Sequence, residues 1–157
     1  MRPAMTLRPL VLLVVAALAA VALVVPAAEA GAGDVQAIRT LAARYSDATT
    51  TGSPLACQLM VPGFRPYFIS FASQMTKTKL ATCPDAVKAV AKLNEAAYPS
   101  HAAYLHANAA KAQAIAHGKV AIQGTDATLD FTVHSGFVSV GSTLDFALVQ
   151  GHWLVSG

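Results

Sequence analysis

The fold of this chain is decided by one segment near its C-terminus, Ala127-Thr128-Leu129-Asp130-Phe131-Thr132-Val133-His134. Apolar and polar side chains alternate along it without a break. Because successive side chains of a β-strand point to opposite faces of a sheet, one face of this strand is apolar and the other polar. The segment predicts an antiparallel strand with one face on the protein core and the other in water.

The neighbouring segments repeat this period of two. Their apolar positions are Val120, Ile122, Leu144, Phe146 and Leu148. The turns between the segments are expected at Gly124-Thr125-Asp126, Ser135-Gly136 and Gln150-Gly151. The last turn leads into a final short strand, where we expect Trp153 to be anchored in the core. The C-terminal part therefore predicts a meander of antiparallel strands.

Helical spacing replaces the period of two in the N-terminal half. Apolar residues recur every three or four positions over 35–48, which predicts a helix with Asp34 as its N-cap and Gly52 at its C-terminal end. Ser53-Pro54 indicates the start of a short second helix. Thr82-Cys83-Pro84-Asp85 matches the capping pattern of a further helix.

Two segments leave their structure open. The aromatic-rich residues 64–71 fit either a short helix after Pro66 or an irregular loop, and the alanine-rich residues 101–116 fit either a helix or a strand. Helices followed by a meander describe an α+β domain in which the helices cover the apolar face of the sheet. Asp130 and Asp145 alternate with the apolar strand positions, so we expect both carboxylates on the opposite face, in water.

The first 30 residues have the three parts of a secretory signal peptide. Arg2 and Arg8 give a positive start, residues 10–25 are uniformly apolar, and Ala28-Glu29-Ala30 fits a cleavage site. An uncleaved membrane anchor is the alternative, because a span of about 17 to 25 apolar residues crosses a bilayer. We expect a signal peptide at 1–30, one domain at 31–157, and a secreted or cell-envelope location.

The cysteines and the charges fit an exported protein without a nucleic-acid partner. Cys57 and Cys83 are the two cysteines, and an even pair outside a Cys-x-x-Cys motif predicts a structural disulfide in an oxidising compartment. The net charge is +3, but the basic residues are scattered, with Lys77 and Lys79 the one close pair. They lack the interleaved aromatic residues of a strand-binding surface.

Three stretches of the chain resemble the nuclear transport factor 2-like superfamily, in the form of its exported actinobacterial members with two cysteines. They are Tyr45-Ser46-Asp47-Ala48 with the following Gly52 and Cys57-Gln58-Leu59, then Cys83-Pro84-Asp85-Ala86-Val87, and the ending Leu144-Asp145-Phe146-Ala147-Leu148-Val149-Gln150-Gly151-His152-Trp153-Leu154-Val155, in which a glycine turn precedes the tryptophan. The resemblance covers nearly all of 31–157. It implies a cone, or cystatin-like α+β roll, of N-terminal helices packed on a curved antiparallel sheet.

The resemblance also implies two classes of function. Ketosteroid isomerases and polyketide cyclases of this superfamily place an acidic base and a hydrogen-bonding tyrosine or acid inside the cone, whereas other members only bind or assemble. Since Asp130 and Asp145 are expected outside, we assign no catalytic residue. The histidines have no metal-ligand spacing, and no nucleophile elbow or phosphate-binding glycine loop is present, so we expect neither a metal nor a cofactor.

We therefore expect a non-catalytic binding domain, with an isomerase- or cyclase-like enzyme that uses the cone pocket as the alternative. The candidate lining of a pocket for a small apolar ligand is Tyr45, Tyr67, Phe68 and Phe131. For Tyr45 and for the aromatic cluster 64–71, simple core packing is the competing interpretation. A homodimer or another partner is expected at the polar outer sheet face, which carries Thr128, Asp130, Thr132, His134, Thr143 and Asp145.

Overall fold

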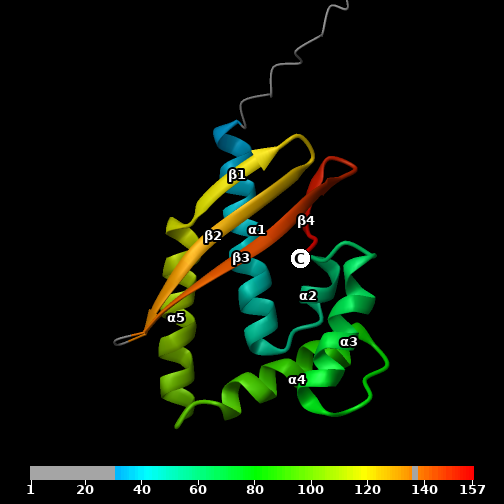
Figure 1. Cartoon of the computed structure of the whole chain (residues 1–157), viewed down its shortest axis with the longest axis vertical. Coiled ribbons are helices and arrows are strands. Elements are labelled where there is room, and N and C mark those ends of the chain that lie inside the picture. The colour runs from blue at the N-terminus through cyan, green and yellow to red at the C-terminus, as the bar shows by residue number, and fades with distance from the viewer. Residues whose placement is uncertain (1–30, 136–137) are drawn as a thin grey trace, which may run out of the picture.

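A computed structural model describes residues 31–135 and 138–157, so the predicted signal peptide lies outside the described residues. The helices in this part are α1 (Ala32–Thr51), α2 (Leu55–Gln58), α3 (Phe64–Thr76), α4 (Cys83–Ala96) and α5 (His101–His117). The strands are β1 (Lys119–Gln123), β2 (Asp126–Ser135), β3 (Val138–Val149) and β4 (His152–Val155). They form one antiparallel sheet in the order β1-β2-β3-β4 (Figure 1). The predicted α+β fold is confirmed.

The helices cover one face of the sheet. In Figure 1, α1 runs behind the strands, and α5 packs along β2. Leu129, Phe131 and Phe146 on this inner face are buried, and they share one core with Ile38 of α1 and Ile115 of α5. The alternation of the sequence thus placed the apolar side of the strands correctly.

The outer face of the sheet is polar and exposed. Asp130 and Asp145 both lie in water on this face, as predicted. Thr143 lies opposite Asp130 in the register and donates a hydrogen bond from Oγ1 to Asp130 Oδ1 at 2.7 Å. Asp126 is exposed on the same face, since it precedes Asp130 by four residues of one strand.

The ends of α1 are set by glycines. Gly52 follows the helix in the left-handed conformation, with φ 70°, and its N–H donates to the Ala48 carbonyl, as its position predicts. The prediction of Asp34 as N-cap is wrong, because the helix starts earlier. The Gly31 carbonyl accepts the N–H of Asp34 at 2.8 Å, and Asp34 lies in the first turn.

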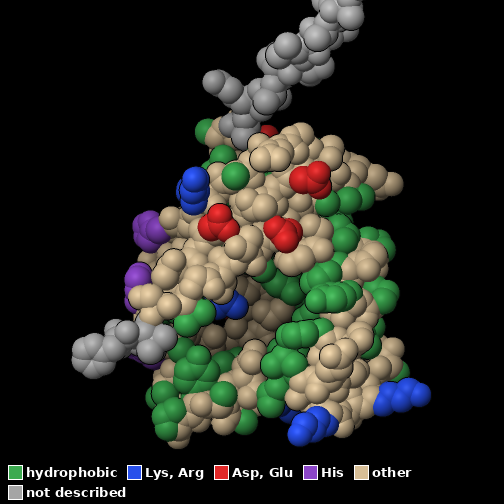
Figure 2. Space-filling view, in the orientation of Figure 1, with side chains coloured by type: hydrophobic (Ala, Val, Ile, Leu, Met, Phe, Trp, Pro, Cys, Tyr) green, Lys and Arg blue, Asp and Glu red, His purple; other side chains and the backbone are tan. Residues whose placement is uncertain are grey.

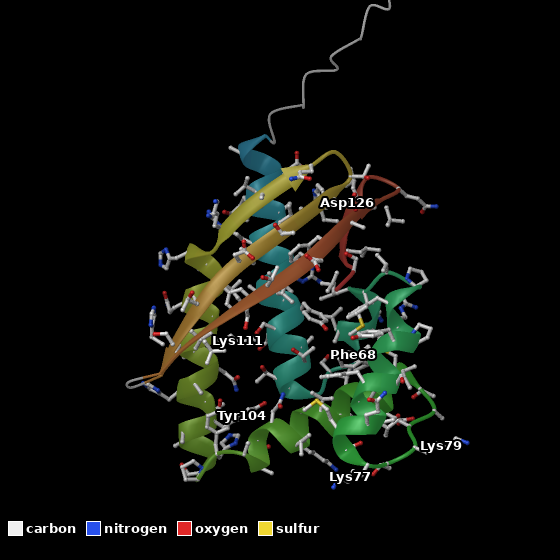
Figure 3. The ribbon with its side chains drawn as sticks, in the orientation of Figure 1. Phe68, Lys77, Lys79, Tyr104, Lys111 and Asp126 are labelled. Carbon is white, nitrogen blue, oxygen red and sulfur yellow. A yellow bond between two sulfur atoms is a disulfide. The ribbon has the colours of Figure 1, made fainter. Side chains whose placement is uncertain are left out.

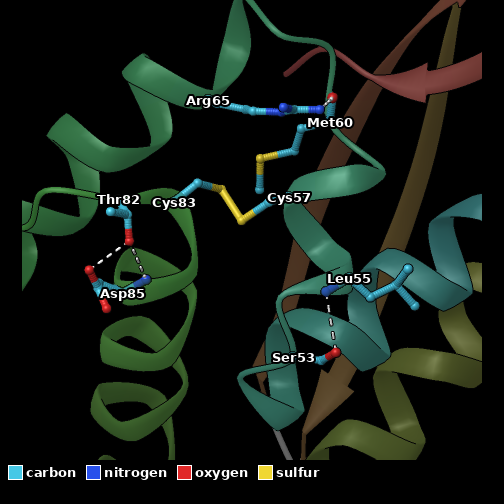
Figure 4. Close-up of a disulfide and its surroundings, with 8 residues drawn as sticks. All are labelled: Ser53, Leu55, Cys57, Met60, Arg65, Thr82, Cys83 and Asp85. Atoms are coloured by element: carbon cyan, nitrogen blue, oxygen red, sulfur yellow. Dashed lines mark hydrogen bonds between the residues drawn. A yellow bond between two sulfur atoms is a disulfide. The ribbon is translucent and has the colours of Figure 1, made fainter.

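A disulfide joins α2 to the first turn of α4 (Figure 4). The pair is Cys57–Cys83, with the Cα atoms 6.0 Å apart, which confirms the predicted link. Thr82 caps α4, since its Oγ1 accepts the N–H of Asp85 at 3.3 Å. None of the described helices is long and apolar enough to cross a membrane.

The two segments that the sequence left open are both helical. Pro66 lies in the first turn of α3, where the absence of an N–H costs nothing, so α3 starts at Phe64 rather than after the proline. The alanine-rich stretch forms α5.

Gly118 fixes how closely α5 approaches the sheet. A Cβ atom at this position would lie 2.6 Å from Leu129 Cδ1 and 2.9 Å from the carbonyl oxygen of Asp130. The Gly118 carbonyl also accepts a hydrogen bond from Arg39 Nη2 of α1 at 2.9 Å. The junction between α5 and β1 is therefore held against both α1 and β2.

Candidate ligand-binding cleft

The inner face of the sheet is left partly uncovered at one end. Strand β1 pairs with β2 only as far as Asp130, and β4 pairs with β3 only over 146–149, so the β2–β3 hairpin continues as a two-stranded ribbon. Val133 on its inner face is half-buried, and Val140 opposite it is 54% exposed. Figure 2 shows a hollow between the sheet and the helices, with a basic side chain on its wall.

This hollow consists of two adjoining parts, which we call the cleft. The sheet-side part has a volume of about 520 Å³ and is bounded by α5 and by the inner face of β2 and β3. The helix-side part, of about 470 Å³, lies between the ends of α1 and α4 and the start of α5. Tyr98, Asn108 and Lys111 line both parts. Each volume falls in the range of small-molecule sites, roughly 300 to 1,000 Å³.

Helix α5 brings the polar lining residues to the cleft. Tyr104 and Ile115 are buried, and they fall on one stripe of the helix with the partly buried Ala107, Asn108 and Lys111. The stripe is the face that α5 turns toward the rest of the protein. Figure 3 shows Lys111 and Tyr104 on the side of α5 nearer α1. An asparagine and a lysine thus occupy positions that an ordinary amphipathic helix fills with apolar residues.

Lys111 places an uncompensated positive charge in the cleft. Its ammonium makes no ion pair or hydrogen bond with any described residue, and neither part of the cleft has an aspartate or glutamate among its described lining residues. Burial lowers the pKa of Lys111 below its usual value of 10.5. The physical cause is desolvation, which disfavours the charged form.

Asn108 adds a hydrogen-bond donor one helical turn from Lys111. Its Nδ2 atom is buried and has no partner among the described residues, while its Oδ1 accepts from Thr50 Oγ1 at 3.4 Å. The Tyr104 hydroxyl donates to the Thr50 carbonyl at 2.8 Å, so α1 and α5 are tied together beside the cleft. The Asn108 side chain thus lines the cleft with a buried N–H group that has no acceptor among the described residues.

The structure separates the four candidate pocket residues. Phe131 lines the sheet-side part of the cleft. Tyr45 is in the core at 9% exposure, where burial raises its pKa to about 12, and Phe68 is also a core residue. Tyr67 is 67% exposed on α3, with its ring 5.7 Å from that of Phe64. Phe131, Tyr45 and Phe68 all belong to the hydrophobic core. Of these three residues, Phe131 is the one that also lines the cleft.

A larger hollow of about 720 Å³ follows the free edge of β2, beside the end of α5. Three of its polar lining residues already have partners within the protein. His134 Nδ1 lies 2.8 Å from Ser139 Oγ, and Asp130 accepts from Thr143. Within residues 31–135 and 138–157, no group of three histidine, cysteine or acidic residues is arranged to hold a metal ion.

Reasoning from the sequence missed Tyr98, Asn108 and Lys111. The signal that identifies them is the helical spacing of the buried stripe on α5, and this spacing has no meaning until the segment is known to be a helix. In the sequence alone, Lys111 is one of several scattered basic residues.

Comparison of the chain with protein-family models, with curated proteins and with solved structures gives no match.

Proposed function

We propose that this protein is an exported, non-catalytic binding domain that holds a small ligand in the cleft between α5 and the inner face of the sheet. One observation carries the proposal. The cleft combines exposed apolar side chains on the inner face, such as Val140, with a lysine and an amide N–H that have no partners among the described residues. A concave, largely apolar surface with a few convergent polar groups is typical of a small-molecule site.

An isomerase- or cyclase-like enzyme fits this cleft less well. Such chemistry needs a carboxylate base within hydrogen-bond reach of the substrate. The described lining residues of the cleft include no carboxylate, and Asp130 and Asp145 lie on the other face of the sheet. Tyr45, one of the candidate pocket residues, packs in the core instead of lining the cleft.

We place the domain in the nuclear transport factor 2-like superfamily as part of this proposal. The helices cover one face of an antiparallel sheet, and the cleft opens on that same face, as in a cone. The disulfide Cys57–Cys83 supports a location outside the cytoplasm, because such bonds persist in oxidising compartments.

A homodimer through the outer sheet face stays a prediction, and the charges on that face weigh against it. Asp126, Asp130 and Asp145 are exposed there, and Figure 2 shows acidic side chains spaced over it. A two-fold contact would bring these carboxylates close to their copies. A dimer that forms there is therefore expected to be favoured by high salt, which screens like charges.

The proposed function is tested with a neutral apolar probe, N-phenyl-1-naphthylamine, whose fluorescence rises in apolar sites. We expect the protein secreted from the full chain to bind it, and Ser142→Trp to abolish this binding, because Ser142 lines the sheet-side part of the cleft. Thr143→Trp is the matched control, since the next residue of β3 points to the outer face. Equal binding by both variants would place the probe outside the cleft and overturn the proposal.

A further inference from the structure

The two parts of the cleft differ in chemistry, and this difference identifies a class of ligand. The sheet-side part is walled by Phe131, Val133 and Val140, and the helix-side part by polar groups such as Thr50 and Asn94. Lys111 and Asn108 lie at the junction, because they line both parts. An occupant of the whole cleft therefore meets an apolar wall on one side and hydrogen-bond donors on the other.

On the basis of the proposed function, we propose that the ligand is an anionic amphiphile with a carboxylate head bound by Lys111 and Asn108. Its apolar body lies along the inner face of the β2–β3 hairpin. The ligand thus has one charged end and one extended or ringed apolar part, as in a medium-chain fatty acid.

The head group follows from the charges of the cleft. A partly buried ammonium is disfavoured unless an anion compensates it, and the described lining residues supply none. A carboxylate can accept from the Lys111 ammonium and from the unpaired Nδ2–H of Asn108 together. A cationic amphiphile would face the Lys111 charge with no carboxylate on the cleft wall to offset the repulsion.

The apolar body follows from the exposure of the inner face. Val140 is 54% exposed although it lies on the face that is buried elsewhere along β2 and β3. Tyr98 is 41% exposed at the opposite wall. Covering apolar surface of this kind is favourable, because it removes that surface from water.

The test is a competition experiment in which decanoate, decanol and decylamine each displace N-phenyl-1-naphthylamine from protein secreted from the full chain. We expect decanoate to bind about ten-fold or more tightly than decanol, the size of one charge-assisted hydrogen bond, and decylamine to bind more weakly than either. Lys111→Met is expected to remove the preference for decanoate, so that decanoate and decanol displace the probe at similar concentrations.

Two further variants separate the charge from other effects. Lys111→Gln keeps a polar side chain but removes the charge, and it is also expected to lose the preference for decanoate over decanol. This second variant shows whether the loss comes from the missing charge or from a change in the shape of the cleft caused by Lys111→Met. Lys92→Met removes an exposed lysine of α4 that does not line the cleft, and it is expected to behave as the unmodified protein.

The outcomes distinguish this inference from the proposed function. Binding of the probe with equal affinity for decanoate and decanol would overturn the carboxylate assignment and leave the binding function standing. A preference for decanoate that survives both Lys111 variants would overturn it too, because the head group would then be recognised elsewhere. Failure of the probe and of all three competitors to bind would overturn both proposals.

Discussion

The indole N–H of Trp153 donates a hydrogen bond to the carboxylate of Asp34, with 3.1 Å between Nε1 and Oδ1. This bond joins β4 to the first turn of α1. The sequence predicts a core anchor at Trp153, but the side chain is partly buried and packs against the edge of the core. Trp153 therefore contributes both by packing against the core and by a hydrogen bond that links β4 to α1.

Trp153→Ala is expected to lower the free energy of unfolding by about 2 to 3 kcal/mol, less than for a fully enclosed aromatic residue. Trp153→Phe keeps most of the packing and should cost about 1 kcal/mol, the size of one hydrogen bond. Urea unfolding followed by circular dichroism measures both changes. An equal loss for the two variants would show that packing of the ring does not contribute.

Lys111 is expected to reduce stability at neutral pH. Because burial lowers its pKa in the folded state, its penalty is fully present below that pKa and disappears as the pH rises toward 10.5. Lys111→Met should therefore stabilise the protein at pH 7 by about 0.5 to 1 kcal/mol. The gain should shrink as the pH approaches 10.5, and Lys92→Met should show no such trend. Thermal melts of both variants and of the unmodified protein at several pH values measure these changes. If Lys111→Met were less stable than the unmodified protein at pH 7, the prediction would be wrong.

Tyr45 has the opposite effect at high pH. Its pKa is raised from 10.0 to about 12 by burial, so its contribution is fully present below pH 10 and is lost as the pH rises through 12. At about 1.4 kcal/mol per pKa unit, the loss approaches about 3 kcal/mol. Tyr45→Phe should remove this part of the alkaline destabilisation. Tyr67→Phe is the control, because it removes the same hydroxyl group from an exposed side chain instead of a buried one.

Gly118→Ala is expected to destabilise by about 1 to 3 kcal/mol, because the new methyl group would meet Leu129 and the backbone of Asp130. Gly141→Ala is the matched control, since a Cβ at that strand position has no atom within 4 Å. The difference between the two melting temperatures measures the steric cost. Similar melting temperatures would mean that α5 can shift without penalty.

Reduction of Cys57–Cys83 should lower stability by roughly 3 kcal/mol, the entropic value for a separation of 26 residues. Unfolding in urea with and without a reducing agent tests this. A Cys57→Ala, Cys83→Ala double variant serves as the control for side effects of the reductant, and its stability should match that of the reduced protein.

The sheet was predictable because burial of one face imposes strict alternation on β2 and β3. Helix α5 was not predictable, because alanine occurs at both buried and exposed positions. An alanine-rich segment therefore shows no clear period of apolar and polar residues. The residues of the cleft were missed for the same reason. Tyr45 and Phe68 were considered for a pocket because they are aromatic, but the core of a small domain uses such side chains for packing first.

The disulfide and the cleft lie at opposite ends of α4. Cys83 is in its first turn, whereas Asn94 near its last turn lines the cleft, about 16 Å away along the helix axis. Substitutions on α5 and the β2–β3 hairpin would therefore change the lining of the proposed ligand cleft while the disulfide-linked end of α4 stays as it is. The residues that would set ligand preference are thus separate from the covalent link that is expected to stabilise the domain.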